Sequence, residues 1–114
     1  MLTKTDDCFR CHHCNALPEN GMDDRLIKLL NDMDIMAPEI NSAYRCEEHN
    51  AAVGGVPNSF HVQGIAADID ASAHESVDAL AELAEKHGAD GIGKYYDAFF
   101  VHTDTRGYEA RWEE

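Results

Sequence analysis

The chain has 114 residues, and nine lysines and arginines against 22 aspartates and glutamates give it a formal net charge of −13. A chain of this length forms one domain with a modest core. The negative charge argues against a nucleic-acid partner, because binding through phosphates requires clustered cations. It also disfavours anionic membrane surfaces, and no apolar run approaches the ~20 residues of a spanning helix. We therefore expect one monomeric domain over residues 1–114, with no nucleic-acid partner and no membrane insertion.

The N-terminal sequence MLTKTDDCFRC turns polar and acidic and lacks the apolar segment of a secretory signal. Either the protein is made in the cytoplasm without a signal peptide, or a signal preceded residue 1. Residues 1–20 are the irregular part of the sequence, so we expect a cysteine-rich N-terminal segment without regular structure. From Asp23 on, apolar residues recur at helical spacing, which predicts a helix that ends before Pro38.

The rest of the chain mixes strand and helix patterns. Residues 39–45 predict a short strand, and 46–55 predict a short helix ended by two glycines. Residues 64–71 predict a strand with one buried face. A long helix over 74–88 follows, with Ser72 and Glu75 as its capping box, and then two or three antiparallel strands over 91–112. We therefore expect an α+β fold, in which a small antiparallel sheet packs with two or three helices.

Polar side chains recur on two of the predicted strands. Because side chains alternate along a strand, His102 and Asp104 project to the same face of theirs, and Asp68 lies on a second strand. Buried carboxylates of this kind usually pair with cations or bind a metal, since an unpaired buried charge costs several kcal/mol. His61 precedes Gly64 in a loop that can fold back onto the Asp68 strand.

Three of these residues would supply a set of zinc ligands. Two histidines and one carboxylate, here His61, Asp68 and His102, leave one tetrahedral position open on zinc, as in catalytic sites. Zinc in such a site activates water and polarises a carbonyl, and a nearby carboxylate can carry the proton to the leaving amine. The spacings alone also occur by chance, and a surface strand can display such residues without any metal.

Two segments of the sequence carry a family resemblance. They are SAYRCEEHNAAVGGVPNSFHVQGIAADID and GIGKYYDAFFVHTDTRG. Both resemble the zinc D-Ala-D-Ala carboxypeptidase and L-alanyl-D-glutamate endopeptidase family of peptidoglycan peptidases, whose fold is shared with the hedgehog signalling domain. The element Ser-x-His-x-x-Gly-x-Ala-x-Asp is complete, at Ser59, His61, Gly64, Ala66 and Asp68. The resemblance implies a zinc metallopeptidase with a hedgehog-type fold.

The resemblance also implies roles for single residues. His61, Asp68 and His102 would bind the catalytic zinc ion. Arg45 would reach into the site and hold a substrate carboxylate or steady an oxyanion, and Ser59 would shape the substrate site through hydrogen bonds. The alternative for Arg45 is a surface cation at the end of a strand.

The general base requires a separate hypothesis. Many members of the family carry an acid three residues before the last histidine, and this chain has Phe99 there. We expect Asp104 to be the base because it shares a strand face with His102; its alternative role is to orient the ring of a zinc ligand. Asp97, in a predicted turn, is the second candidate.

The cysteines form a separate motif. Cys8, Cys11 and Cys14 follow one another at Cys-x-x-Cys spacing, and Cys46 comes directly after the predicted site arginine. Together they can hold a second, structural zinc ion, with His12 or His13 replacing one thiolate, or form disulfides, or remain reduced thiols.

These observations predict a zinc-dependent peptidase that hydrolyses amide bonds in peptidoglycan stem peptides, as a carboxypeptidase or an endopeptidase. We expect a phage or prophage lysis enzyme that acts on the cell wall after release, or a part of a virion. One alternative is a non-catalytic, zinc-containing binding module of the same fold. The other is that the cysteines form the only metal site.

Overall fold

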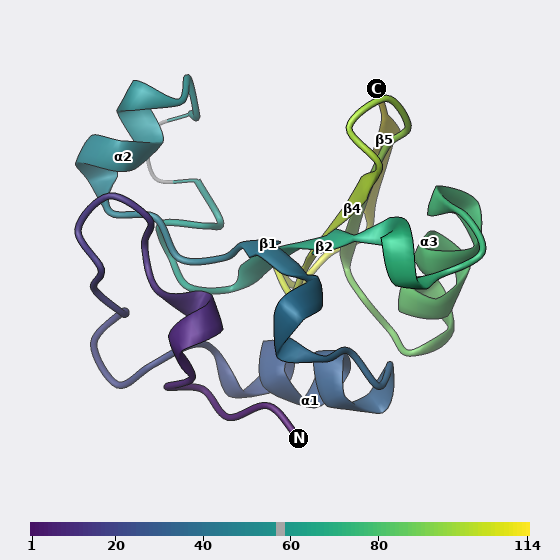
Figure 1. Ribbon diagram of the computed structural model, residues 1–114, viewed down its shortest axis with the longest axis horizontal. Helices are drawn as coiled ribbons and strands as arrows, with labels where there is room; N and C mark the ends of the chain where they lie inside the picture. Colours follow the sequence, from purple (N-terminus) through teal and green to yellow (C-terminus); the bar gives the residue numbers. More distant parts are fainter. Residues whose placement is uncertain (57–58) are drawn as a thin grey trace.

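The computed structural model describes residues 1–56 and 59–114, so the segment that carries the resemblance is described except for its residues 57–58 (Figure 1). Short 3-10 turns lie at Asp7–Phe9, Ala37–Glu39 and Ala71–Ala73. The helices and strands are α1 (Asp24–Asp32), β1 (Ile40–Ser42), α2 (Glu47–Ala52), β2 (Ala66–Asp70), α3 (Val77–Lys86), β3 (Gly91–Tyr95), β4 (Phe100–Asp104) and β5 (Ala110–Glu113). The predicted α+β fold class is confirmed.

The strands form one sheet in the order β1-β2-β4-β3-β5. All neighbours in it are antiparallel except β5, which runs parallel to β3. Of the two or three antiparallel strands expected over residues 91–112, β3 and β4 are antiparallel to each other, and the third, β5, is parallel to β3. After β4, Gly107 N donates to Asp90 Oδ2 and Ala110 N donates to the Asp90 carbonyl oxygen. These bonds direct the chain to the free edge of β3, where it pairs in parallel.

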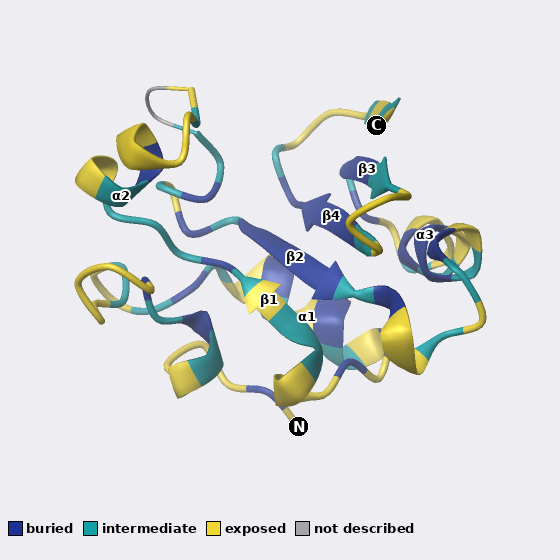
Figure 2. Ribbon diagram, turned by 45° about the horizontal axis from the view of Figure 1, so that its top comes forward, coloured by how far each residue is buried: buried dark blue, intermediate teal, exposed yellow. Residues whose placement is uncertain are grey.

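The two faces of the sheet differ in chemistry because side chains alternate along each strand. Ala67, Ile69, Ile92 and Val101 point into the hydrophobic core, together with the apolar faces of α1 and α3. Figure 2 shows β2 buried along almost its whole length, with α1 behind it and α3 to one side. The opposite face of the sheet does not contribute to this core, so polar side chains can occupy it. Within the described residues, no helix has the length and apolar character needed to cross a membrane.

The start of α3 differs from the prediction. The helix begins at Val77, and its N-cap is Ser76, whose side chain accepts a hydrogen bond from Ala79 N at 3.0 Å. Ser72, the predicted cap, lies in the preceding 3-10 turn and bonds instead to Asp70 Oδ1, through both its backbone N and its hydroxyl. A local bond to the end of β2 therefore replaces the expected capping box.

Replacing Ser76 with Ala should lower the free energy of unfolding by about 1 kcal/mol, because the first turn of α3 loses its side-chain cap. Ser72→Ala is the matched control and should change it by less than about 0.5 kcal/mol, as expected of an exposed site. Urea denaturation followed by circular dichroism measures both values. A larger loss for Ser72→Ala would show that the first turn is capped as the sequence pattern suggested.

Candidate metal centre

Asp68 and His102 lie directly opposite each other on the polar face of the sheet. The antiparallel register of β2 and β4 pairs them, and His102 Nδ1 lies 3.1 Å from Asp68 Oδ1. Both side chains are about nine-tenths buried. The alternation that was expected to bring these strands' polar residues together therefore does so.

His61 joins this pair from a loop. Its Nε2 lies 3.4 Å from Asp68 Oδ1, and its Nδ1 donates to the carbonyl oxygen of Ala43 at 2.7 Å. Gly64, with a φ of 74°, lets the chain turn back toward β2 after the histidine. The Ala43 carbonyl fixes the ring so that Nε2 faces the carboxylate.

The three side chains fit a zinc ion. Their ligand atoms all lie within 4.8 Å of one another. Zn–N and Zn–O bonds of about 2.0–2.2 Å place neighbouring donors about 3.4 Å apart in a tetrahedron. The 3.4 Å and 3.1 Å separations at Asp68 Oδ1 are close to this value. The set leaves a fourth tetrahedral position for water or substrate.

The charges of the site depend on one another. Burial acts to raise the pKa of Asp68, but hydrogen bonds with His102 and His61 hold it well below its usual range. Burial likewise acts to lower the pKa of His102, and the carboxylates of Asp104 and Asp68 raise it above the ordinary value. Because metal binding requires a neutral imidazole, a metal ion at this site would displace the extra proton from His102.

Asp104 lies behind His102 and is fully buried. Its Oδ2 lies 2.7 Å from His102 Nε2, the ring nitrogen opposite the one that faces Asp68. Arg106 binds the same carboxylate through Nε and Nη2, at distances of 2.7–3.1 Å, and Gly91 N donates to Oδ1. This contact pattern orients an imidazole, which is the alternative role considered for Asp104.

The other candidate base lies away from the three candidate metal ligands. Asp97 is exposed in the turn between β3 and β4, and it does not line the cleft. Phe99, at the position where many relatives carry an acid, has a φ of 58° and an exposed side chain, and it does not line the cleft either.

Arg45 reaches the site as expected. Its Nη2 lies 3.6 Å from Asp68 Oδ2, and its Nη1 donates to Asn50 Oδ1 at 3.4 Å. Ser59 also donates to Asn50 Oδ1, at 3.0 Å, and Asn50 Nδ2 donates to the Val56 carbonyl oxygen. Asn50 therefore connects α2 to the loop before His61, a role for this buried amide that no sequence pattern predicts.

A cleft of about 610 Å³ opens over these residues. Its walls include Arg106 and the aromatic rings of Phe60, Tyr95, Phe100 and Trp112. The Arg106 guanidinium stacks 4.3 Å from the Phe60 ring centroid and 5.2 Å from that of Trp112. No short motif marks these residues in the sequence; the one sequence feature that indicates them is the aromatic content of the C-terminal strands.

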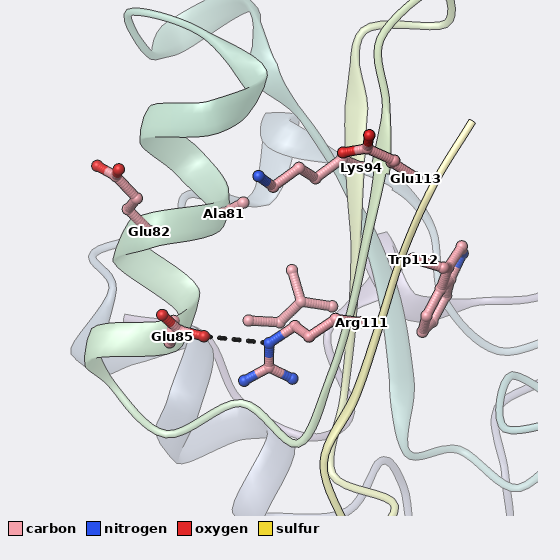
Figure 3. A pocket seen from close by; sticks show the side chains of 8 residues that line it. Ala81, Glu82, Glu85, Lys94, Arg111, Trp112 and Glu113 are labelled. Atoms are coloured by element: carbon pink, nitrogen blue, oxygen red, sulfur yellow. Dashed lines mark hydrogen bonds and ion pairs between the residues drawn. The ribbon is translucent and has the colours of Figure 1, made fainter.

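A second hollow, of about 330 Å³, lies between α3 and the β3–β5 edge (Figure 3). The ion pair between Arg111 and Glu85 crosses it, at 3.1 Å. The Trp112 ring lies on the other side of its strand, toward the metal ligands. This hollow contains none of the three candidate ligands, so the chemistry belongs to the larger cleft.

Three of the four cysteines also come together. Cys11, Cys14 and Cys46 have their sulfur atoms within 4.8 Å of one another, and Cys8 is not part of this group. None of the four forms a disulfide. Burial raises the pKa of Cys8 to about 11, because its side chain packs against the hydrophobic core.

Asp104→Asn should weaken zinc binding about 10-fold to 100-fold, because the His102 ring loses its carboxylate partner. Competition with a chromophoric chelator measures the affinity. Asp97→Asn is the matched control and should bind zinc as the wild type does. Equal affinity for Asp104→Asn and the wild type would refute the orienting role.

Two comparisons place the chain among known proteins. The sequence pattern of the peptidase M15 family matches residues 21–104. The zinc D-Ala-D-Ala carboxypeptidase of Streptomyces albus G is 35% identical over 74 residues, which are 64% of this chain and 29% of that relative. The chain thus spans less than a third of the relative's length. Since the family pattern covers most of the chain, including His61, Asp68 and His102, the protein belongs to the peptidase M15 family.

Proposed function

We propose that the protein is a zinc-dependent peptidase that hydrolyses amide bonds in peptidoglycan stem peptides. The observation that carries the proposal is the arrangement of His61, Asp68 and His102, with donor separations suited to zinc, at the base of a cleft. The relative whose name specifies zinc and D-Ala-D-Ala supports the same class of substrate. The site of action is then the bacterial cell wall, reached after release from a host cell or as part of a virion.

Zinc at this site would supply a Lewis acid that polarises the scissile carbonyl and acidifies water. The protein's own residues hold the geometry. The Ala43 carbonyl fixes the His61 ring, and Asp104 fixes that of His102. The Arg106 guanidinium forms an ion pair with the Asp104 carboxylate. The pair compensates the buried negative charge, so Asp104 stays ionised.

We propose that Arg45 binds a carboxylate of the substrate. Stem peptides end in a carboxylate and carry another on D-glutamate, and a guanidinium binds carboxylates with two parallel hydrogen bonds. The Arg45 side chain lines the cleft and is 18% exposed, so an anionic group in the cleft can reach it. Its bond to Asn50 holds the guanidinium in place beside the metal ligands.

The size and walls of the cleft fit a short peptide. Ligand sites usually measure about 300–1,000 Å³, and the 610 Å³ cleft lies within this range. Phe60, Tyr95 and Trp112 provide apolar walls for the small alanine side chains of a stem peptide. Among the described residues that line the cleft, Arg45 and Arg106 carry guanidinium groups; Arg106 is paired with Asp104, which leaves Arg45, 3.6 Å from Asp68, as the one available to a substrate anion.

One observation favours a second candidate, a zinc-containing binding module of the same fold. Of the described residues that line the cleft, Asp68 is the one carboxylate, and it belongs to the proposed ligand set. Asp104 is fully buried and already bonded to His102 and Arg106. A binding module requires no proton acceptor, whereas a peptidase must bring one to the cleft.

Incubation with defined muropeptides, followed by mass spectrometry of the products, decides between the two. A peptidase should release fragments whose masses identify the cleaved amide bond. The activity should be lost when a chelator removes the metal and restored when zinc is added. His61→Ala should release no fragments. Stoichiometric zinc binding without any released fragment, from D-Ala-D-Ala, L-Ala-D-Glu or cross-linked muropeptides, would support the binding module instead.

Arg45→Ala should lower kcat/KM about 10-fold to 100-fold, because a charge-assisted hydrogen bond contributes about 1.5–3 kcal/mol. Arg45→Lys should recover part of the loss, since the charge remains and the two-pronged geometry does not. Arg25→Ala is the matched control, because Arg25 pairs with Asp90 on the exposed surface, and it should keep wild-type kinetics. An unchanged kcat/KM for Arg45→Ala at wild-type zinc content would rule out its role in substrate binding.

A further inference from the structure

The three clustered cysteines lie at distances that suit a metal ion. Cys11 Sγ and Cys46 Sγ are 3.7 Å apart. A disulfide requires about 2.05 Å between its sulfur atoms. Zn–S bonds of about 2.3 Å place two thiolates about 3.75 Å apart in a tetrahedron. The observed separation therefore matches two thiolates on one zinc ion.

The backbone around the cluster holds the sulfur atoms in place. Cys46 N donates to Cys11 Sγ, and His49 N donates to Cys46 Sγ, each at 3.4 Å. Cys11 and Cys14 flank a tight loop that is closed by a bond from Asn15 N to the Cys11 carbonyl oxygen. Hydrogen bonds from backbone N–H groups favour the charged form of an acceptor, here the thiolates that bind zinc.

We propose that Cys11, Cys14 and Cys46 bind a second zinc ion, separate from the candidate metal centre, and that His49 is its fourth ligand. The three sulfur atoms lie within 4.8 Å of one another, and His49, which lies outside that group, would have to turn its ring toward them to complete the four protein ligands of a structural zinc site. The proposal narrows the four-cysteine set expected from the sequence, because Cys8 lies outside the group and packs against the core.

The position of His49 favours it over His13 as the fourth ligand, and His12, whose ring centroid lies 6.4 Å from that of His49, is the remaining alternative. His49 lies in the first turn of α2, three residues after the N-cap Cys46, and its backbone N already donates to Cys46 Sγ. Its ring stacks on that of His13, with 5.9 Å between the centroids, so it already lies beside the Cys11–Cys14 loop. His13 itself pairs with Glu48 at 3.3 Å. The resulting pattern is Cys-x-x-Cys followed by Cys-x-x-His.

Such a zinc ion would connect the N-terminal segment to the loop that carries Arg45. Figure 1 shows the N-terminal segment passing beside the start of α2, and the Phe9 carbonyl oxygen accepts a bond from Tyr44 N. Cys11 and Cys46 are 35 residues apart in sequence, and a metal that closes a long loop reduces the freedom of the unfolded chain. The ion would therefore fix the backbone next to Arg45.

Metal analysis of protein purified under reducing conditions tests the proposal. The wild type should contain two zinc ions per chain, and Cys14→Ser and Cys46→Ser should each contain one. His61→Ala should lose the other ion and keep the cysteine site. Cys8→Ser is the matched control and should keep both. One ion in the wild type that Cys46→Ser retains and His61→Ala loses would overturn the cysteine site and leave the proposed peptidase site intact.

Cobalt substitution in the His61→Ala variant provides a readout that does not depend on activity or stoichiometry. Thiolate ligands give cobalt an intense near-ultraviolet charge-transfer band, which should be present here and absent once Cys11 is also replaced by Ser. Adding His49→Ala should shift the visible bands, and adding His12→Ala should not; the reverse would refute His49 as the ligand. Absence of the band would overturn the proposal. An intramolecular disulfide between Cys11 and Cys46 in protein purified without a reducing agent would overturn it as well.

Discussion

The register between β2 and β4 is the constraint on which the site depends. It places Asp68 opposite His102, and the same pairing places Ala67 and Ile69 on the core face. Because side chains alternate, a slip of either strand by one residue would turn its own candidate ligand toward the helices and expose its own apolar residues. The hydrophobic core therefore selects the register, and the candidate metal centre lies on the face that does not contribute to the core.

The neighbouring strand β3 makes room for this polar face by carrying glycines. Gly93 lies opposite His102 in the sheet, and Gly91 lies opposite Asp104. A β-carbon at Gly93 would overlap the Trp112 ring, and one at Gly91 would overlap the Asp104 carboxylate. The missing side chains let Trp112 approach the His102 ring to 5.1 Å between centroids and let Asp104 reach the far nitrogen. Strand β3 thus supports the site by leaving space.

The sequence was sufficient for the fold class, the family and the meeting of His61, Asp68 and His102, because each depends on strand alternation and a short motif. It was insufficient where a distant contact overrides a local pattern. Ser72 had the spacing of a cap, yet the nearby Asp70 carboxylate takes its hydrogen bonds. The strand pattern of β5 held no information on its partner, and its parallel pairing follows from the bonds to Asp90. The contributions of Asn50 and Arg106 to the site could not be predicted for a related reason. Each depends on contacts with residues of other elements or across a turn, which no local pattern encodes.

Arg45 occupies the position where these constraints meet. On one side its guanidinium faces Asp68, and on the other its backbone leads directly into Cys46. Its backbone N also donates to the His61 carbonyl oxygen at 3.3 Å, so the segment is tied to the ligand loop as well. A long, flexible side chain loses more entropy on binding when its backbone is mobile, and anchoring the backbone reduces that cost. The cysteine cluster can therefore influence the cleft without touching a substrate, by fixing the residue that we propose to hold one.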